Sequence, residues 1–225
     1  PRYILISDKW LKYFPSYEIF YTIGNYHFLN LESIEKEIYD GLGLLLTTSG
    51  STGTQKYVRL SKENVLKNAI AISKYLNLTE RDLPITTLPP SYTFGLSIIH
   101  SHIIVGASIA VSNLSFFDKE FWTFFNNIKV TSLSGVPYHY EILNKLKFRS
   151  KVYPHLKSLT QAGGKLSDKI VIDFARYSEE NGINFYIMYG QTEATARMTY
   201  LDPKTVKNKP NSIGKAIPGG KLLLI

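Results

Sequence analysis

The chain has 225 residues, a net charge of +8 and no cysteine; 44% of its residues are hydrophobic and 20% are charged. This composition is typical of a folded globular protein, and it excludes disulfides, a cysteine nucleophile and thiolate metal ligands. The basic residues form no run of five, which weighs against a nucleic-acid binder.

In the first third of the chain, apolar runs of strand length precede one long helix. The pattern predicts strands at residues 2–7, 18–23, 44–48 and 58–60. Ser61 is a suitable N-cap for a helix that reaches about residue 78, and Glu63 is favourable in its first turn. The apolar residues of this helix lie largely on one face, as packing against a sheet requires.

The remainder of the chain alternates strands with helices. The expected strands are residues 85–88, 108–111, 130–133, 158–161 and 184–189, and residues 222–225 also read as a strand. The expected helices are residues 94–105, 119–127, 137–146 and a segment capped by Ser167 that ends near residue 180. This alternation predicts an α/β fold with a layered, largely parallel sheet flanked by helices. Ligands of such sheets bind beyond the carboxyl ends of the strands.

A run of small hydroxyl residues and glycines follows the strand at residues 44–48. It consists of Thr48, Ser49, Gly50, Ser51, Thr52, Gly53, Thr54, Gln55 and Lys56. Glycines let the backbone approach a ligand closely, and consecutive N–H groups form a concavity that binds anions. Hydroxyls add donors and the lysine adds a positive charge suited to phosphate. We therefore interpret the run as a loop for a polyphosphate, with a plain surface turn as the alternative.

Two other glycine-rich motifs do not fit this run. A Walker A loop needs four residues between its first glycine and a Gly-Lys pair, but only two residues separate Gly50 from Gly53. A nucleophile elbow needs a glycine two residues before its serine, and Ser49 occupies that place before Ser51. A hydrolase that uses Ser51 as its nucleophile is therefore a distant alternative.

Three motifs, in this order, resemble those of the adenylate-forming (AMP-binding) superfamily. That superfamily includes acyl-CoA synthetases, aryl-acid ligases, luciferases and peptide-synthetase adenylation domains. Residues 48–56 resemble its phosphate loop, T-S-G-S-T-G-T-P-K-G, and residues 189–195 resemble its Y-G-x-T-E motif. Residues 212–219 resemble its G-S-x-G-x-P-x-P-G motif, and weaker landmarks lie at residues 134–137 and 161–164.

The resemblance covers roughly residues 42–225, with four departures from the motifs. Gln55 and Tyr57 replace a proline and a glycine of the phosphate loop, and Asn211 and Ala216 replace a glycine and a proline of the third motif. The implied fold is part of the large N-terminal domain of an adenylate-forming enzyme, with a subdomain boundary between residues 40 and 60. The C-terminal domain, which carries a catalytic lysine in the family, is expected to be absent from residues 1–225. The chain alone would then be an incomplete and poorly active fragment.

The implied reaction has two steps. A carboxylic acid attacks the α-phosphorus of ATP to give acyl-AMP and pyrophosphate, and a thiol then displaces AMP. ATP and Mg²⁺ are the implied cofactors. The thiol is that of coenzyme A or of phosphopantetheine on an acyl carrier protein, because this chain has no cysteine. The excess of 26 Lys+Arg over 18 Asp+Glu would attract ATP and acidic carriers, or it reflects lysine-rich codon usage.

The resemblance also implies roles for the residues after the later strands. Thr192 would donate to the α-phosphate or the acid, and Glu193 would bind Mg²⁺, whose preferred ligands are oxygens. Tyr189 would stack on adenine. The remaining residues of the implied AMP site are Gly163, Gly164, Gly190 and Gln191. Each role has a structural alternative. Glu193 could simply favour a helix dipole, Tyr189 could be a core tyrosine at a strand end, and Gly163 and Gly164 could form a simple turn.

The implied acyl pocket comprises Tyr92, Phe94, Gly95, Val136 and Pro137, for which ordinary core packing is the alternative. No acidic residue lies between Asp82 and Asp118 to pair with a substrate ammonium group. Because a buried charge without a partner is costly, this absence weighs against α-amino acids and favours an acyl or aryl acid.

Other expectations concern location and rival functions. The longest apolar stretch, residues 94–107, is too short and too polar to cross a bilayer, and no signal peptide is recognisable, so we expect a cytoplasmic location. We expect no zinc, because the five histidines form no ligand pattern. A regulatory module that binds nucleotide without turnover is the main alternative function. The sequence indicates no oligomeric state.

Overall fold

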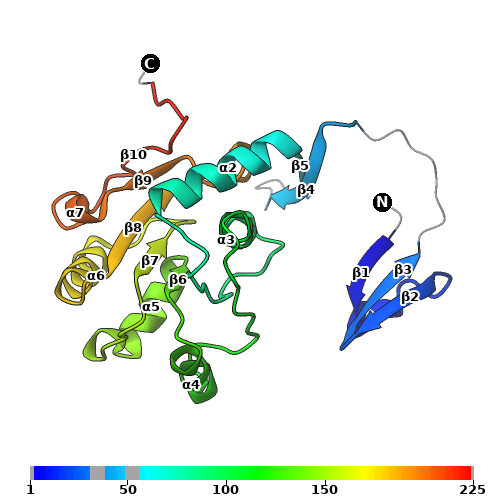
Figure 1. Ribbon diagram of the computed structural model, residues 1–225, viewed down its shortest axis with the longest axis horizontal. Helices are drawn as coiled ribbons and strands as arrows, with labels where there is room; N and C mark the ends of the chain where they lie inside the picture. The colour runs from blue at the N-terminus through cyan, green and yellow to red at the C-terminus, as the bar shows by residue number, and fades with distance from the viewer. Residues whose placement is uncertain (1–2, 31–38, 49–55, 224–225) are drawn as a thin grey trace. The chain divides into compact units, whose positions relative to one another are not determined.

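The computed structural model describes residues 3–30, 39–48 and 56–223, and it divides into the units Pro1–Asp40 and Gly41–Ile225 (Figure 1). The first unit is an antiparallel sheet in the order β1-β3-β2. Its elements are β1 (Tyr3–Ser7), α1 (Asp8–Leu11), β2 (Glu18–Ile23) and β3 (Tyr26–Asn30). Gly24, in the two-residue turn between β2 and β3, has a φ of +55°, which glycine adopts without strain.

A hairpin begins the second unit. Strands β4 (Leu42–Thr48) and β5 (Lys56–Ser61) pair antiparallel, with Thr48 opposite Lys56. These two residues therefore flank residues 49–55, which lie outside the described part of the chain. Helix α2 (Lys62–Tyr75) follows at once, and the Ser61 hydroxyl accepts a hydrogen bond from the backbone N–H of Asn64 at 3.0 Å. The predicted N-cap is confirmed.

The main sheet has the strand order β10-β9-β8-β7-β6. The strands are β6 (Ser132–Gly135), β7 (Ser158–Gln161), β8 (Asn184–Tyr189), β9 (Thr199–Leu201) and β10 (Lys215–Ala216). Strands β6, β7 and β8 are parallel, whereas β9 and β10 are antiparallel to their neighbours. A parallel crossover needs a dozen or more residues, so the short connection 190–198 obliges β9 to return antiparallel. The α/β prediction is confirmed, with the parallel pairing confined to β6, β7 and β8.

Helices cover both faces of this sheet. Phe185 and Ile187 of β8 belong to one buried cluster, and Tyr186 and Met188 belong to another, because successive side chains of a strand point to opposite faces. The first cluster lies under α4 (Lys119–Asn127), α5 (Pro137–Lys145) and α6 (Asp168–Glu180) (Figure 1). The second lies under α2 and α3 (Thr93–Ile103). Shorter elements are η1 (Phe148–Ser150), η2 (Thr192–Ala194) and α7 (Pro203–Val206).

Several expected elements differ in the structure. Residues 85–88 and 108–111 form no strands and are joined by the isolated parallel bridge Ile85–Ala110, next to a second one between Pro84 and Ser132. Prolines flank residues 85–88 and lack the N–H that a continuous ladder needs, so Ile85 is buried as core without a strand. The strand expected at 130–133 is β6, two residues later, and residues 222–223 are not in a strand. The Ser167 side chain makes no capping hydrogen bond.

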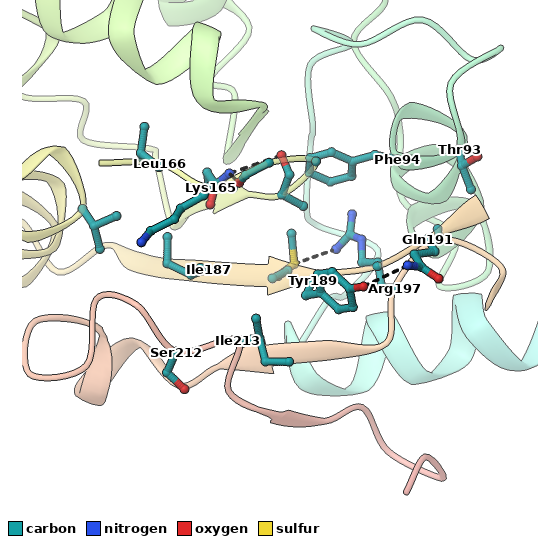
Figure 2. A pocket seen from close by; sticks show the side chains of 18 of the residues that line it. Thr93, Phe94, Lys165, Leu166, Ile187, Tyr189, Gln191, Arg197, Ser212 and Ile213 are labelled. Carbon is teal, nitrogen blue, oxygen red and sulfur yellow. Dashed lines mark hydrogen bonds between the residues drawn. The ribbon is translucent and has the colours of Figure 1, made fainter. Parts of the chain in front are cut away.

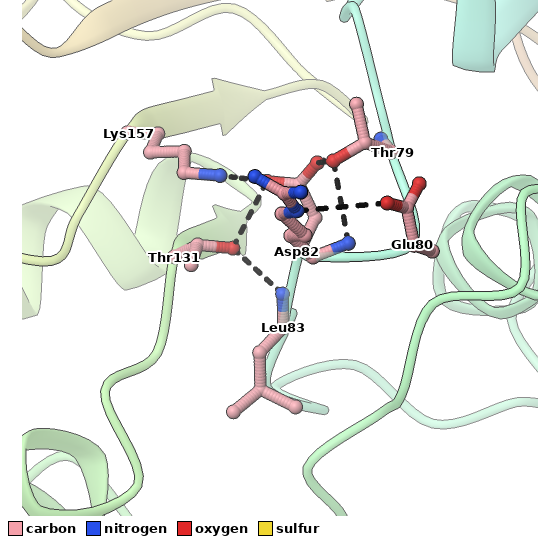
Figure 3. Close-up of polar contacts among 7 residues, drawn as sticks. Thr79, Glu80, Asp82, Leu83, Thr131 and Lys157 are labelled. Carbon is pink, nitrogen blue, oxygen red and sulfur yellow. Dashed lines mark hydrogen bonds and ion pairs between the residues drawn. The ribbon is translucent and has the colours of Figure 1, made fainter.

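Asp82 connects the segment after α2 to the residues that directly precede β6 and β7 (Figure 3). Its carboxylate accepts hydrogen bonds from the Thr79 backbone N–H at 2.7 Å and from Lys157 Nζ at 2.9 Å. Thr131 Oγ1, which also contacts Asp82, accepts a hydrogen bond from the Leu83 N–H at 2.7 Å. Burial alone would raise the pKa of Asp82, but the hydrogen bonds from Lys157 and Thr79 outweigh it and hold that pKa below its usual value.

Candidate active site

A cavity of about 560 Å³ opens beyond the carboxyl ends of β7 and β8 (Figure 2). Gly163 and Gly164 follow β7 and line one side, and Tyr189, Gly190 and Gln191 line another. The motif segment around Ser212 completes the wall. Three segments that are distant in the sequence thus meet at the sheet edge where α/β proteins bind ligands.

The turn after β7 is shaped by its glycines. Gly163 has a φ of +80°, and a Cβ there would lie 2.4 Å from the Tyr92 hydroxyl and 3.0 Å from Val136 Cγ1. The buried Gln161 side chain donates a hydrogen bond to the Gly164 carbonyl at 2.9 Å. Glycine at position 163 therefore makes room for the Tyr92 hydroxyl beside the turn, and burial raises the pKa of Tyr92.

The segment after β8 is folded back on itself. A Cβ at Gly190 would lie 1.5 Å from the Ala196 carbonyl oxygen, so only glycine fits there. Farther along the chain, a Cβ at Gly214 would lie 2.0 Å from the Tyr200 carbonyl oxygen. Both glycines of the sequence motifs thus allow close backbone packing around β9.

Two side-chain hydrogen bonds fix the polar wall of the cavity. The Gln191 amide donates to the Tyr189 hydroxyl at 2.9 Å, and the hydroxyls of Thr93 and Thr192 lie 2.8 Å apart. The second bond joins the first residue of α3 to η2. The Tyr189 side chain is 37% exposed, so its ring face is accessible to a planar ligand.

A second cavity of about 460 Å³ adjoins the first. Both cavities are lined by Tyr92, Gln191 and Thr192. The second also has Thr48, the last described residue before the glycine-rich run, and Glu193, which lies in η2 and is exposed. In the described ranges no three His, Cys, Asp or Glu side chains are grouped to hold a metal, so a cation here would draw most of its ligands from a bound molecule and water.

Phe94 also lines the first cavity, whereas the remaining predicted site residues in the described ranges line neither cavity. Val136 and Pro137 lie behind the Gly163–Gly164 turn, because Cβ atoms built on those glycines would approach them to 3.0 and 3.1 Å. Gly95 packs against the carbonyl of Pro89. Lys56 is exposed at the end of β5. Residues predicted to bind phosphate also fall outside the described part of the chain: Ser49, Gly50, Ser51, Thr52, Gly53 and Thr54.

Sequence reasoning missed two residues that the cavity contains. Thr93, paired with Thr192, lies within the segment assigned to the acyl pocket but was not singled out. Arg197 lines the cavity although it is only 3% exposed. A single basic residue between Ala196 and Met198, in an otherwise weakly polar run, was the available signal.

Fold and site together define an α/β domain with a cavity of mixed polar and apolar lining at a sheet edge. A family model described as "AMP-binding enzyme" matches residues 31–225. The chain belongs to this AMP-binding enzyme family, and the resemblance seen in its motifs is confirmed. No helix in the described ranges is both long and apolar enough to span a bilayer.

Named relatives agree with the family. A 2-succinylbenzoate–CoA ligase of Listeria monocytogenes is 31% identical over 174 residues, which are 77% of this chain and 36% of the relative. A 2-succinylbenzoate–CoA ligase of Staphylococcus aureus is 25% identical over 78% of this chain and 34% of the relative. The chain thus spans about a third of the length of these relatives.

Solved structures share the fold. The o-succinylbenzoate CoA synthetase of Bacillus subtilis, in complex with ATP and magnesium ion, matches with a TM-score of 0.69 and 24% identity, over 84% of this chain and 39% of that one. The N-terminal domain of FACL13 from Mycobacterium tuberculosis, bound to an inhibitor, matches with a TM-score of 0.69 and 18% identity, over 82% of this chain and 46% of that one.

Proposed function

We propose that the protein containing this chain activates a carboxylic acid with ATP as an acyl-adenylate and passes the acyl group to a thiol. The observation that carries the proposal is the pair of adjoining cavities that share Tyr92, Gln191 and Thr192. One cavity offers a ring surface, Tyr189, and a glycine turn, and the other contains Thr48, the residue that precedes residues 49–55 of the family's glycine-rich run in the sequence. A nucleotide with its phosphates toward the second cavity would extend across both and share the larger cavity with the acid.

In the first step, an oxygen of the acid's carboxylate forms a bond to the α-phosphorus of ATP. The bond from that phosphorus to the oxygen bridging to the β-phosphate breaks, and pyrophosphate leaves. Catalysis of such a step consists mainly of positioning and of stabilising charge. Thr192 would donate to the α-phosphate or the acid, while Thr93 orients its hydroxyl. The run from Thr48 to Lys56 would hold the β- and γ-phosphates.

Mg²⁺ fits this site as a partner of the nucleotide. Glu193 is exposed, lines the second cavity and makes none of the hydrogen bonds formed by the described residues, so its carboxylate is available as an oxygen ligand. A bound Mg²⁺ would neutralise phosphate charge. Glu193 is its proposed protein ligand.

In the second step, a thiol sulfur forms a bond to the acyl carbon, AMP leaves and the thiol proton is lost. Coenzyme A is the first candidate, because the named relatives are CoA ligases. A carrier-bound phosphopantetheine is the alternative. The acid itself is a proposal of class only; 2-succinylbenzoate belongs in any test because the relatives' names carry it.

Carboxylate-dependent ATP–pyrophosphate exchange tests the first step directly. The full product of the gene would be assayed with fatty, aryl and amino acids and with 2-succinylbenzoate, with Lys56→Ala and Glu193→Ala as variants. We expect exchange with one class of acid and a loss of about 100-fold or more in each variant. Magnesium-dependent ATP binding without exchange for any acid would instead favour a non-catalytic nucleotide-binding module.

A further inference from the structure

The inner wall of the larger cavity carries a buried positive charge. Arg197 is 3% exposed and lines this cavity, where Figure 2 shows it among the lining side chains with its bond to a methionine sulfur. Within the described ranges, no carboxylate forms an ion pair with it. Arginine does not lose its proton in proteins, so it cannot escape the cost of burial by becoming neutral.

The groups that hold Arg197 are all neutral. Its Nε donates to Ser97 Oγ at 3.1 Å, and its Nη1 donates to the Tyr75 hydroxyl at 3.1 Å. The Phe94 ring lies 5.0 Å from its Cζ. Burial raises the pKa of Tyr75, despite the opposing effect of Arg197, so Tyr75 remains protonated at neutral pH and supplies no counter-charge.

One nitrogen of the guanidinium, Nη2, forms no hydrogen bond with the described residues. This atom is nevertheless not among the polar atoms that are closed off from solvent without a partner. Nη2 therefore has access to open space, and the space that Arg197 lines is the cavity. The N–H groups of this charged nitrogen can donate hydrogen bonds to an anionic group such as a carboxylate.

The other lining residues strengthen the case for an anion. None of the described residues that line this cavity is acidic, and Lys165, which is exposed, adds a second positive charge. Met188, Ile187 and Leu166 give the same cavity an apolar wall. Arg197 does not line the second cavity, where Thr48 and Glu193 mark the side proposed for the phosphates. The charge thus lies in the larger cavity, away from the side proposed for the phosphates.

We propose that Arg197 binds an anionic group at the far end of the acid, so that the preferred substrate has an apolar body and a second carboxylate or similar anion. This inference rests on the proposed function. Leaving the guanidinium unpaired is costly, and an anionic substituent would remove that cost on binding. An ammonium-bearing acid would be repelled by the same residue. Arg197 is therefore a specificity-determining residue of the acid pocket.

The test compares dicarboxylic acids with their mono-amides, which differ only in the distal charge. Suberate would be paired with suberamate, and isophthalate with isophthalamate, in pyrophosphate exchange by the full gene product. We expect kcat/KM to favour the dianion about 10- to 100-fold, and we expect Arg197→Met to abolish that ratio. Arg197→Lys should retain part of the ratio, because it keeps the charge but loses the hydrogen bonds that position the guanidinium. Arg176→Met, which removes an exposed arginine on α6, should leave the ratio unchanged.

Two results would overturn the proposal. One is a wild-type enzyme that prefers the amides, which needs no variant and holds even if Arg197→Met does not fold. The other is an equal loss with both members of each pair in Arg197→Met, which would assign Arg197 to the reacting carboxylate or the nucleotide. Thermal-shift binding of the same acids provides a second readout. If no acid supports exchange but the dianions still bind more tightly through Arg197, the activity fails and the anion site stands.

Discussion

At the scale of single residues, the shape of the cavity depends on the close approach of the Tyr92 hydroxyl to Gly163. The Tyr92 hydroxyl lies where a side chain at position 163 would begin, so Gly163 and Tyr92 must be considered together. Gly182 offers a matched comparison, since its φ is +68° and a Cβ there would meet no atom within 4 Å. A side chain at either position would be strained by the positive φ, but only at position 163 would it also collide with a neighbouring side chain.

We predict that Gly163→Ala lowers pyrophosphate exchange whereas Gly182→Ala does not, although each costs about 1–2 kcal/mol of stability through its positive φ. The new Cβ displaces the Tyr92 ring into the cavity. Adding Tyr92→Phe should restore part of the exchange, because the clash at 2.4 Å is with the hydroxyl and the ring Cζ is at 3.6 Å. Thermal unfolding and exchange measured on the three variants check this. An equal loss of exchange in Gly163→Ala and Gly182→Ala would contradict it.

At the scale of elements, Asp82 connects the segment after α2 to the residues that directly precede β6 and β7. The carboxylate is buried and accepts hydrogen bonds from Lys157 and Thr79. Its pKa is held below the usual 3.8, so its folded-state pKa is lower than its unfolded-state pKa. Such a group stabilises the fold above the unfolded-state pKa, and this contribution is lost as the pH falls through the folded-state pKa.

We predict that Asp82→Asn lowers the free energy of unfolding by about 1–2 kcal/mol at pH 7 and that the difference shrinks below about pH 4. Urea unfolding of both proteins at pH 7 and pH 3 measures it. Glu80→Gln is the control: Glu80 forms only an exposed pair with Arg81 at 3.6 Å and should change little. A difference between Asp82→Asn and wild type that is the same at pH 3 would show that the charge of Asp82 is not the cause.

The helices and strands show which parts of the fold the local sequence pattern predicts. Segments with a clear period and a clear start, such as α2 with its Ser61 cap and α4, were predicted from the sequence to within a few residues at each end. Residues 85–88 were also predicted as an element, a strand. Whether they pair as a strand depends on distant partners and on the effect of the flanking prolines, and the local apolar pattern does not report these. Strand β9 was missed because its pairing with β8 is set by the short connection after Gly190.

The same reasoning applies to the site. Glycines, Tyr189 and Thr192 were found because a motif places them directly after a strand, and the structure brings them to one cavity. Arg197 was not found, because its significance lies in the neutral side chains of α2, α3 and β8 that surround it. The absence of a counter-charge is a property of three-dimensional neighbours, and no local pattern reports it.

At the scale of the whole chain, the net charge of +8 carried by residues 1–225 matters for ligands that are anions. A positive protein concentrates ATP near its surface, and salt screens this attraction beyond about 10 Å at 0.1 M. We predict that KM for ATP in the exchange assay rises about three- to tenfold between about 50 and 500 mM NaCl. Inhibition by adenosine, which is uncharged, is the control and should be nearly insensitive to salt. A parallel weakening of adenosine would indicate a structural effect of salt instead.

The two motif glycines that pack against backbone carbonyls, Gly190 and Gly214, also bear on which residues a homologue would keep after losing the proposed activity. Any descendant that ceased to use ATP would still need them, since a methyl group at either position collides with the Ala196 or Tyr200 carbonyl. Glu193 is different: it is exposed, and no hydrogen bond within the described residues depends on it. If Glu193 binds Mg²⁺ as we propose, homologues that have lost the activity would keep the glycines and lose the glutamate. Position 193 would then be the better marker of homologues that retain the proposed activity.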